Sequence, residues 1–183
     1  PIGYDPDAAD NYPANLDTVP AGMTYKLRPD EAIVLIGNTP PPARYFSFRS
    51  YLGFVENKPG KDYTGTPTFG DDEIGWYHRI YCSLGDPLNH LNMWTSNTPG
   101  GAAGNACGSA TVLITTADRG MNRMMRDALT AAGYSPDIIN DDNIPPSLVH
   151  MGLEKGKDTF LIIMRAALWD QPNVGSDYLD NIG

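Results

Sequence analysis

Residues 43–54 contain the side chains in this sequence that are best suited to binding chemistry. In a strand, successive side chains point to opposite faces, so this segment separates into two sets. One face receives Phe46, Phe48 and Leu52, which is the composition of a core face. The other face receives polar side chains, two of them aromatic: Tyr45, Ser47, Arg49 and Tyr51. Tyrosine and arginine are enriched where proteins bind ligands or partners, so this second face is the first candidate site.

Residues 76–83 follow a related pattern, with Tyr77, Arg79, Tyr81 and Ser83 at alternate positions. If the two segments pair, their polar faces form one surface. Arginine donates forked hydrogen bonds to carboxylate or phosphate groups, and tyrosine offers a hydroxyl and a ring. We therefore predict a surface for a small polar or anionic ligand, another protein chain or a second copy of this chain. Its residues are Tyr45, Ser47, Arg49, Tyr51, Tyr77, Arg79 and Tyr81.

This surface also has a purely structural interpretation, because cross-strand aromatic and arginine pairs stabilise sheets without any ligand. Residues 1–31 have no helical or strand period, and we predict an irregular N-terminal arm there. Tyr4, Tyr12 and Tyr25 are the expected anchors that hold this arm against the domain or a neighbouring chain. A sheet face covered in this way would serve assembly instead of ligand binding.

Histidines beside the predicted surface support an alternative function, that of a hydrolase or lyase. In that case His78, Tyr81 and His90 are the candidates for proton transfer. Arg49 and Arg79 would hold a small anionic or hydroxylated substrate. No nucleophile motif accompanies them, since Ser109 lacks the Gly-x-Ser-x-Gly elbow and precedes a strand. The sequence leaves both the binding class and the enzyme class open.

Cysteines and aspartates are the remaining groups with distinctive chemistry. Cys82 and Cys107 form one disulfide in our prediction, and two free thiols are the alternative. No Cys-x-x-Cys pair indicates a zinc site, and we predict no cofactor. Asp5, Asp7 and Asp10 are weak candidates for calcium, because they lack the ligand order of an EF-hand loop.

Composition narrows the function classes. The net charge of -9, with only 13 basic residues, argues against binding to a nucleic-acid backbone. The longest apolar runs are of strand length, so no membrane span is predicted. The chain is rich in glycine, proline and tyrosine, with 19, 16 and 10 residues respectively. This loop-rich balance is more typical of extracellular or periplasmic proteins, which is the localisation we expect.

The elements that position these residues indicate one α+β domain within the chain of 183 residues. We expect a mixed or antiparallel sheet of about five strands at residues 32–37, 44–52, 76–83, 110–116 and 159–168. The apolar stripe within 121–132 predicts one main helix, packed on one face of the sheet and capped by Asp118. Residues 140–146 are expected to form turns, and a crossover would run from 110–116 through the helix to 159–168. Long loops rich in glycine and proline connect these elements.

The predicted organisation is therefore an arm at 1–31, one domain at 32–170 and an irregular tail at 171–183. The function expected from the sequence is that of an extracytoplasmic binding or assembly domain. Its Tyr/Arg/Ser sheet face would hold a ligand, a partner or a neighbouring subunit.

Overall fold

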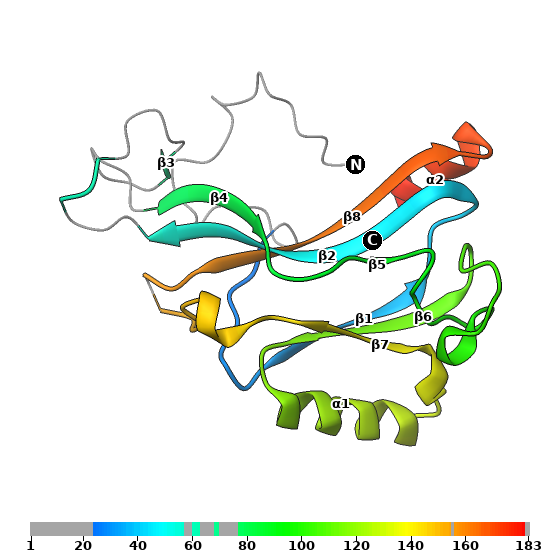
Figure 1. The fold of residues 1–183 in the computed structure, drawn as a ribbon, viewed down its shortest axis with the longest axis horizontal. Coiled ribbons are helices and arrows are strands. Elements are labelled where there is room, and N and C mark those ends of the chain that lie inside the picture. The colour runs from blue at the N-terminus through cyan, green and yellow to red at the C-terminus, as the bar shows by residue number, and fades with distance from the viewer. Residues whose placement is uncertain (1–23, 57–59, 63–67, 70–76, 155, 182–183) are drawn as a thin grey trace.

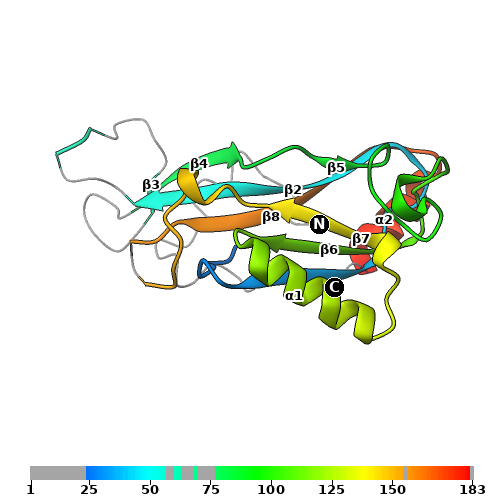
Figure 2. The same cartoon turned by 60° about the horizontal axis from the view of Figure 1, so that its bottom comes forward.

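The computed structural model describes residues 24–56, 60–62, 68–69, 77–154 and 156–181, and for 68–69 and 77–79 it describes the backbone alone. It confirms the predicted α+β class with one main helix. Three layers are stacked: a larger sheet, a smaller sheet, and helix α1 on the far side of the smaller sheet (Figures 1 and 2). The predicted strands are present but divide between the two sheets instead of forming one.

The smaller sheet consists of β1 (Ala32–Asn38), β6 (Ala110–Thr116) and β7 (Ile139–Asn143). β1 pairs with β6 in antiparallel fashion, and β7 pairs with the other side of β6 in parallel. Helix α1 (Arg119–Ala131) connects the two parallel strands. The predicted crossover therefore runs from β6 into α1 as expected, but it ends at β7 and not at the strand of residues 159–168.

The prediction of turns at 140–146 is wrong for residues 140–143, because strand β7 occupies Ile139–Asn143. Ile139, Asn140 and Asp142 on this strand are buried. A strand this polar is stable inside the protein because neighbouring side chains and backbone groups satisfy its hydrogen bonds.

Helix α1 forms for the reasons expected from its sequence. The Asp118 carboxylate accepts a hydrogen bond from the backbone amide of Met121 at 2.6 Å, which caps the first turn. Leu129 and Met125 then pack against Val112 and Ile139 of the smaller sheet. The cap and the apolar stripe together fix which face of the helix meets the sheet.

The larger sheet is antiparallel and is built around β2 (Ala43–Glu56). Strand β8 (Thr159–Trp169) pairs with one side of β2 over most of its length. Strands β4 (Tyr77–Ser83) and β5 (Leu88–Asn89) pair with the other side, and β3 (Thr68–Phe69) pairs with β4. Short 3-10 turns occur at Pro99–Gly101, Pro136–Ile138 and Pro146–Leu148.

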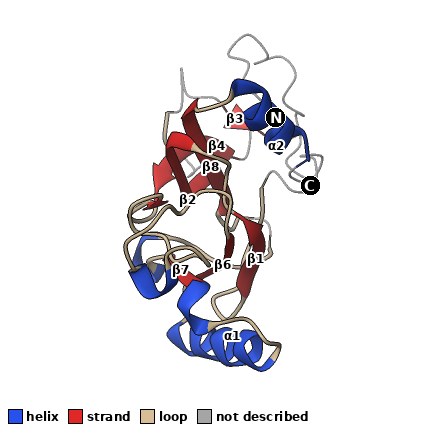
Figure 3. Ribbon diagram, turned by 90° about the vertical axis from the view of Figure 1, so that its right-hand side faces the viewer, coloured by secondary structure: helices blue, strands red, loops and turns tan. Residues whose placement is uncertain are grey.

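The segments predicted to be irregular at the two ends both contain order. Helix α2 occupies Pro172–Asn181, which corrects the tail predicted there (Figure 3). Within the arm, Tyr25 exchanges two backbone hydrogen bonds with Phe160 of β8, at 2.8 and 2.9 Å. Leu27 is buried in the core beside Phe160. The predicted anchors Tyr4 and Tyr12 lie outside the described residues, and the predicted domain boundaries stay predictions.

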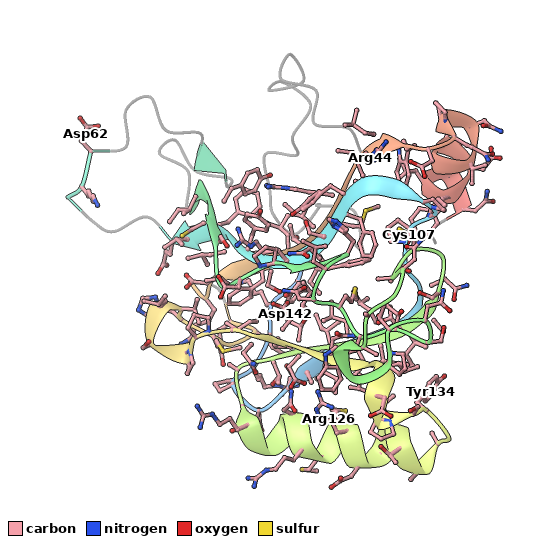
Figure 4. All side chains as sticks on the ribbon, turned by 45° about the vertical axis from the view of Figure 1, so that its right-hand side comes forward. Arg44, Asp62, Cys107, Arg126, Tyr134 and Asp142 are labelled. Atoms are coloured by element: carbon pink, nitrogen blue, oxygen red, sulfur yellow. The ribbon has the colours of Figure 1, made fainter. Side chains whose placement is uncertain are left out.

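A buried carboxylate links the two sheets. The hydroxyls of Ser50 on β2 and Thr115 on β6 both donate to Asp142 Oδ2, the latter at 2.9 Å. All three residues are buried, and Figure 4 places Asp142 between the two layers. Because Ser50 faces the smaller sheet, the odd-numbered residues beside it on β2 face away from that sheet.

The long connection that precedes β6 is tied to the smaller sheet by Asn140. Its side-chain oxygen accepts from the amide of Trp94 at 2.8 Å. Its side-chain nitrogen donates to the carbonyl oxygens of Trp94 and Val112, at 2.8 and 3.1 Å. Asn140 is 4% exposed, so water does not replace these bonds if the side chain is lost.

We predict that Asn140→Ala lowers the free energy of unfolding by about 1–3 kcal/mol, because the backbone amide of Trp94 loses its acceptor, whereas the Trp94 carbonyl oxygen keeps the Thr111 hydroxyl as a donor. Urea denaturation measures this change. Asn173→Ala, at an exposed position on α2, is the matched control and should change stability by less than about 0.5 kcal/mol. Equal stability of the two variants would contradict the role assigned to Asn140.

Candidate functional site

The candidate site is the face of the larger sheet that points away from the smaller sheet. The register pairs Ser47 with Arg165, Arg49 with Ile163 and Tyr51 with Leu161. Paired residues of neighbouring strands share a face. The predicted side chains of β2 therefore lie beside an arginine of β8. We define the outer face as Tyr45, Ser47, Arg49 and Tyr51 of β2 with Arg165 of β8.

Arg165 is held in place by an aromatic ring. Its guanidinium carbon lies 5.2 Å from the centre of the Tyr51 ring, within the range of a cation–π interaction. Tyr51 is only 6% exposed. Arg165 was not among the predicted site residues, and its signal in the sequence is a single charge inside the apolar run at 159–168.

Arg49 has an unusual environment for a charged side chain. It is half-buried, and its Nε atom is buried with no hydrogen-bond partner. Burying a polar N–H group without a partner costs about 1–3 kcal/mol, and more for a charged group. The buried Nε–H group of Arg49 therefore destabilises the folded protein, because no described residue accepts a hydrogen bond from it.

The two arginines are close neighbours. Arg49 and Arg165 occupy diagonal positions across β2 and β8, which corresponds to a separation of about 7–8 Å. The ion pairs among the described residues are Arg28–Glu31, Arg126–Asp141 and His150–Asp158. None of them involves either arginine of the outer face. Two arginines therefore occupy neighbouring positions on the outer face without a counter-charge from the described part of the chain.

A cavity of about 510 Å³ lies beside Arg165, and Arg49 is not part of its wall. Tyr45, Arg165 and Trp169 contribute to its wall. The Tyr45 ring makes an edge-on contact with His90, with ring centres 5.7 Å apart. The Nδ1 atom of His90 is buried without a hydrogen-bond partner. His90 is therefore the predicted acid–base candidate that the structure brings next to Tyr45.

Strand β4 does not continue the outer face by simple alternation. Leu52 pairs with Cys82 and Phe54 with Arg79, so two residues of β4 oppose Gly53. One of them, Tyr81, has a φ of +50°, and its ring packs against Phe54. Such a bulge interrupts the alternation of faces. The side chains of Tyr77, His78 and Arg79 lie outside those described, so their predicted roles stay predictions.

The close approach of β8 explains Gly53, which lies where β2 shifts register against β8. A Cβ atom at Gly53 would lie 2.5 Å from Leu161 Cδ1 and 3.2 Å from the Thr159 carbonyl oxygen. A larger residue would push β2 and β8 apart next to Tyr51.

The predicted disulfide is wrong, since Cys82 and Cys107 are free thiols. Cys82 is exposed on β4 opposite Leu52, whereas Cys107 packs in the cluster around Phe46. Phe46 and Leu52 are separated by roughly 20 Å along β2, at the usual rise of a strand. A disulfide needs Cα atoms within about 7 Å of each other. Figure 4 shows Cys107 away from the β4 end of the sheet.

The calcium candidates Asp5, Asp7 and Asp10 lie outside the described residues. Within the described part of the chain, no group of three or more His, Cys, Asp or Glu side chains is arranged to hold a metal ion. None of the described helices is long and apolar enough to span a membrane.

Comparisons with models of protein families, with curated proteins and with solved structures find no significant match. The functional argument therefore depends on the geometry of the chain itself.

We predict that Arg49→Met raises the melting temperature by about 2–4 °C, which corresponds to about 1 kcal/mol for a domain of this size. Methionine extends as far as the position of Nε and removes both the unpaired N–H and the repulsion with Arg165. Calorimetry measures the shift.

Arg126→Met is the matched control, because Arg126 donates to Asp141 and to the Ile139 carbonyl oxygen, at 2.8 and 3.0 Å. It should lower the melting temperature. If Arg49→Met also destabilises the protein, Arg49 has a structural partner and the site loses its main support.

Proposed function

We propose that this protein is a binding domain whose outer face captures an anionic group of a ligand or partner. The observation that supports this function best is the pair Arg49 and Arg165, which lie on neighbouring strands without a counter-charge among the described residues. A bound anion would offset the positive charges of the two guanidinium groups, and Arg49 is only half-buried, so its guanidinium can take part. This electrostatic gain favours the bound state.

The geometry suits a carboxylate, sulfate or phosphate group. Guanidinium groups donate in a planar fork that matches the oxygens of these anions. The stack on Tyr51 holds Arg165 before any ligand arrives, which reduces the entropy lost on binding. The cavity beside Tyr45 would then receive the part of the ligand that carries the anion.

The net charge of the whole chain disfavours the binding of anions. With a net charge of -9, the protein repels anions at long range. Recognition would therefore depend on short-range hydrogen bonds in a partly desolvated site, where they are stronger than in water. This favours a specific anionic group over indiscriminate binding to anionic polymers.

The test is a titration of the protein with sodium sulfate and, separately, with sodium phosphate, followed through the NMR signals of the arginine Nε–H groups. We expect the Arg49 and Arg165 signals to shift and saturate together. Arg49→Gln or Arg165→Gln should weaken binding by about 10–100-fold, the value of a charge-assisted hydrogen bond. The double variant should abolish it.

Arg123→Gln is the matched control, since Arg123 is exposed on α1 and lies on the opposite side of the smaller sheet. It should bind both anions as the wild type does. If the double variant binds as well as Arg123→Gln, the outer face is not the anion site. Sedimentation velocity of the wild type and the double variant shows whether a second copy, instead of a free ligand, provides the anionic group.

A further inference from the structure

A second cavity lies on the other side of β2, between the two sheets. It has a volume of about 770 Å³. The ribbons of the two sheets separate toward the end that carries α2 (Figure 1), and residues of β1, β2, β6 and α2 all contribute to the cavity wall. The apolar residues of its wall include Leu35, Phe48, Met93, Leu113 and Val174.

Gly37 accounts for part of the empty space. Ile33 belongs to the core between the sheets, whereas Val34 packs on the α1 side. By alternation, Gly37 therefore faces the larger sheet, as Ile33 does. A Cβ atom at Gly37 would have no heavy atom within 4 Å. The chain thus has no side chain at the strand position where one would fill the cavity.

The polar groups of the wall are largely occupied by the protein itself. The Tyr178 hydroxyl donates to the Asn38 carbonyl oxygen at 3.1 Å, and burial raises the pKa of this phenol, which keeps it neutral. The hydroxyl of Thr111 donates to the Trp94 carbonyl oxygen at 2.9 Å. These two hydroxyl groups therefore have partners within the protein before any ligand binds.

The charge of the wall is also distinctive. It contains no lysine, arginine or histidine, and its single carboxylate is that of Asp177 on α2. An anionic ligand would meet this carboxylate and would lose hydration without gaining a counter-charge. The volume lies within the range of pockets for organic ligands, about 300–1,000 Å³.

We propose that this cavity is a second binding site, for an uncharged and predominantly apolar organic molecule. It is distinct from the anion site because Phe48 lines the cavity whereas its neighbour Arg49 lies on the outer face. The chain would then hold two different chemical groups on opposite sides of one strand.

The experiment compares two fluorescent probes of similar shape. N-phenyl-1-naphthylamine is uncharged, and 8-anilinonaphthalene-1-sulfonate carries a sulfonate. We expect saturable binding of the uncharged probe with one site per chain, and binding of the sulfonate weaker by about tenfold or more. Equal binding of the two probes, or no saturable binding of the uncharged one, would overturn the proposal.

Gly37→Leu should occupy part of the cavity and weaken binding of the uncharged probe by about tenfold or more without lowering the melting temperature, because its Cβ meets no atom within 4 Å. Gly85→Leu is the matched control. A Cβ at Gly85 meets only the Asn143 carbonyl oxygen, at 3.8 Å, and Gly85 does not line the cavity. It should bind the probe as the wild type does.

Val174→Asp provides a second variant at an exposed position of α2 that tolerates a polar side chain. The additional carboxylate should weaken binding of the uncharged probe, since it brings a hydrated charge into an apolar wall. Wild-type affinity in both Gly37→Leu and Val174→Asp would place the probe elsewhere. Arg49→Gln should leave probe binding unchanged, which separates this site from the anion site.

Discussion

The carboxylate of Asp142, buried between the two sheets, is the constraint on which the arrangement of this protein depends. A buried carboxylate must have hydrogen-bond donors, and Ser50 from one sheet and Thr115 from the other supply them. Burial and the charge of Asp142 both raise the pKa of the nearby Tyr25 phenol, which therefore stays protonated. These contacts fix the face that β2 presents to the smaller sheet. Because Ser50 points inward, Arg49 and Tyr51 must point outward.

The two faces of β2 consequently have opposite characters. The inward face is part of the apolar core at Phe46 and Leu52, and it leaves a hollow near Phe48 where Gly37 provides no side chain. The outward face carries an arginine whose buried N–H group has no partner. Folding alone would not favour either feature, since both an empty cavity and an unpaired donor cost stability. Sites of this kind are expected where binding has been favoured over stability.

Alternation along β2 was predictable from the sequence because the period of two is a property of the strand itself. The cap at Asp118 and the apolar stripe of α1 were predictable for the same local reason. Strand β7 was not, because its Asn140 and Asp142 resemble turn residues until their partners on other elements are known. Helix α2 was missed because a glycine, Gly175, disfavours a helix in the sequence pattern. In the structure α2 runs through Gly175, which packs so closely against the Trp169 ring that a side chain would not fit there.

The candidate site was predictable only on the β2 side. Its Tyr/Arg face follows from alternation, but the neighbour Arg165 depends on a pairing between segments more than a hundred residues apart. The bulge opposite Gly53 depends on how β4 and β8 pair with the same stretch of β2, which no local pattern encodes. The disulfide prediction failed for a related reason, since cysteine spacing along the chain does not give the distance between thiols in space.

The most direct test of the central claim is anomalous diffraction from crystals soaked in sodium selenate, an analogue of sulfate. The claim is that Arg49 and Arg165 together form an anion site. It predicts a selenium peak within hydrogen-bond distance of both guanidinium groups on the outer face. The claim would be contradicted if selenate occupies other sites and leaves this one empty, or if a carboxylate of the same chain is found paired with Arg49.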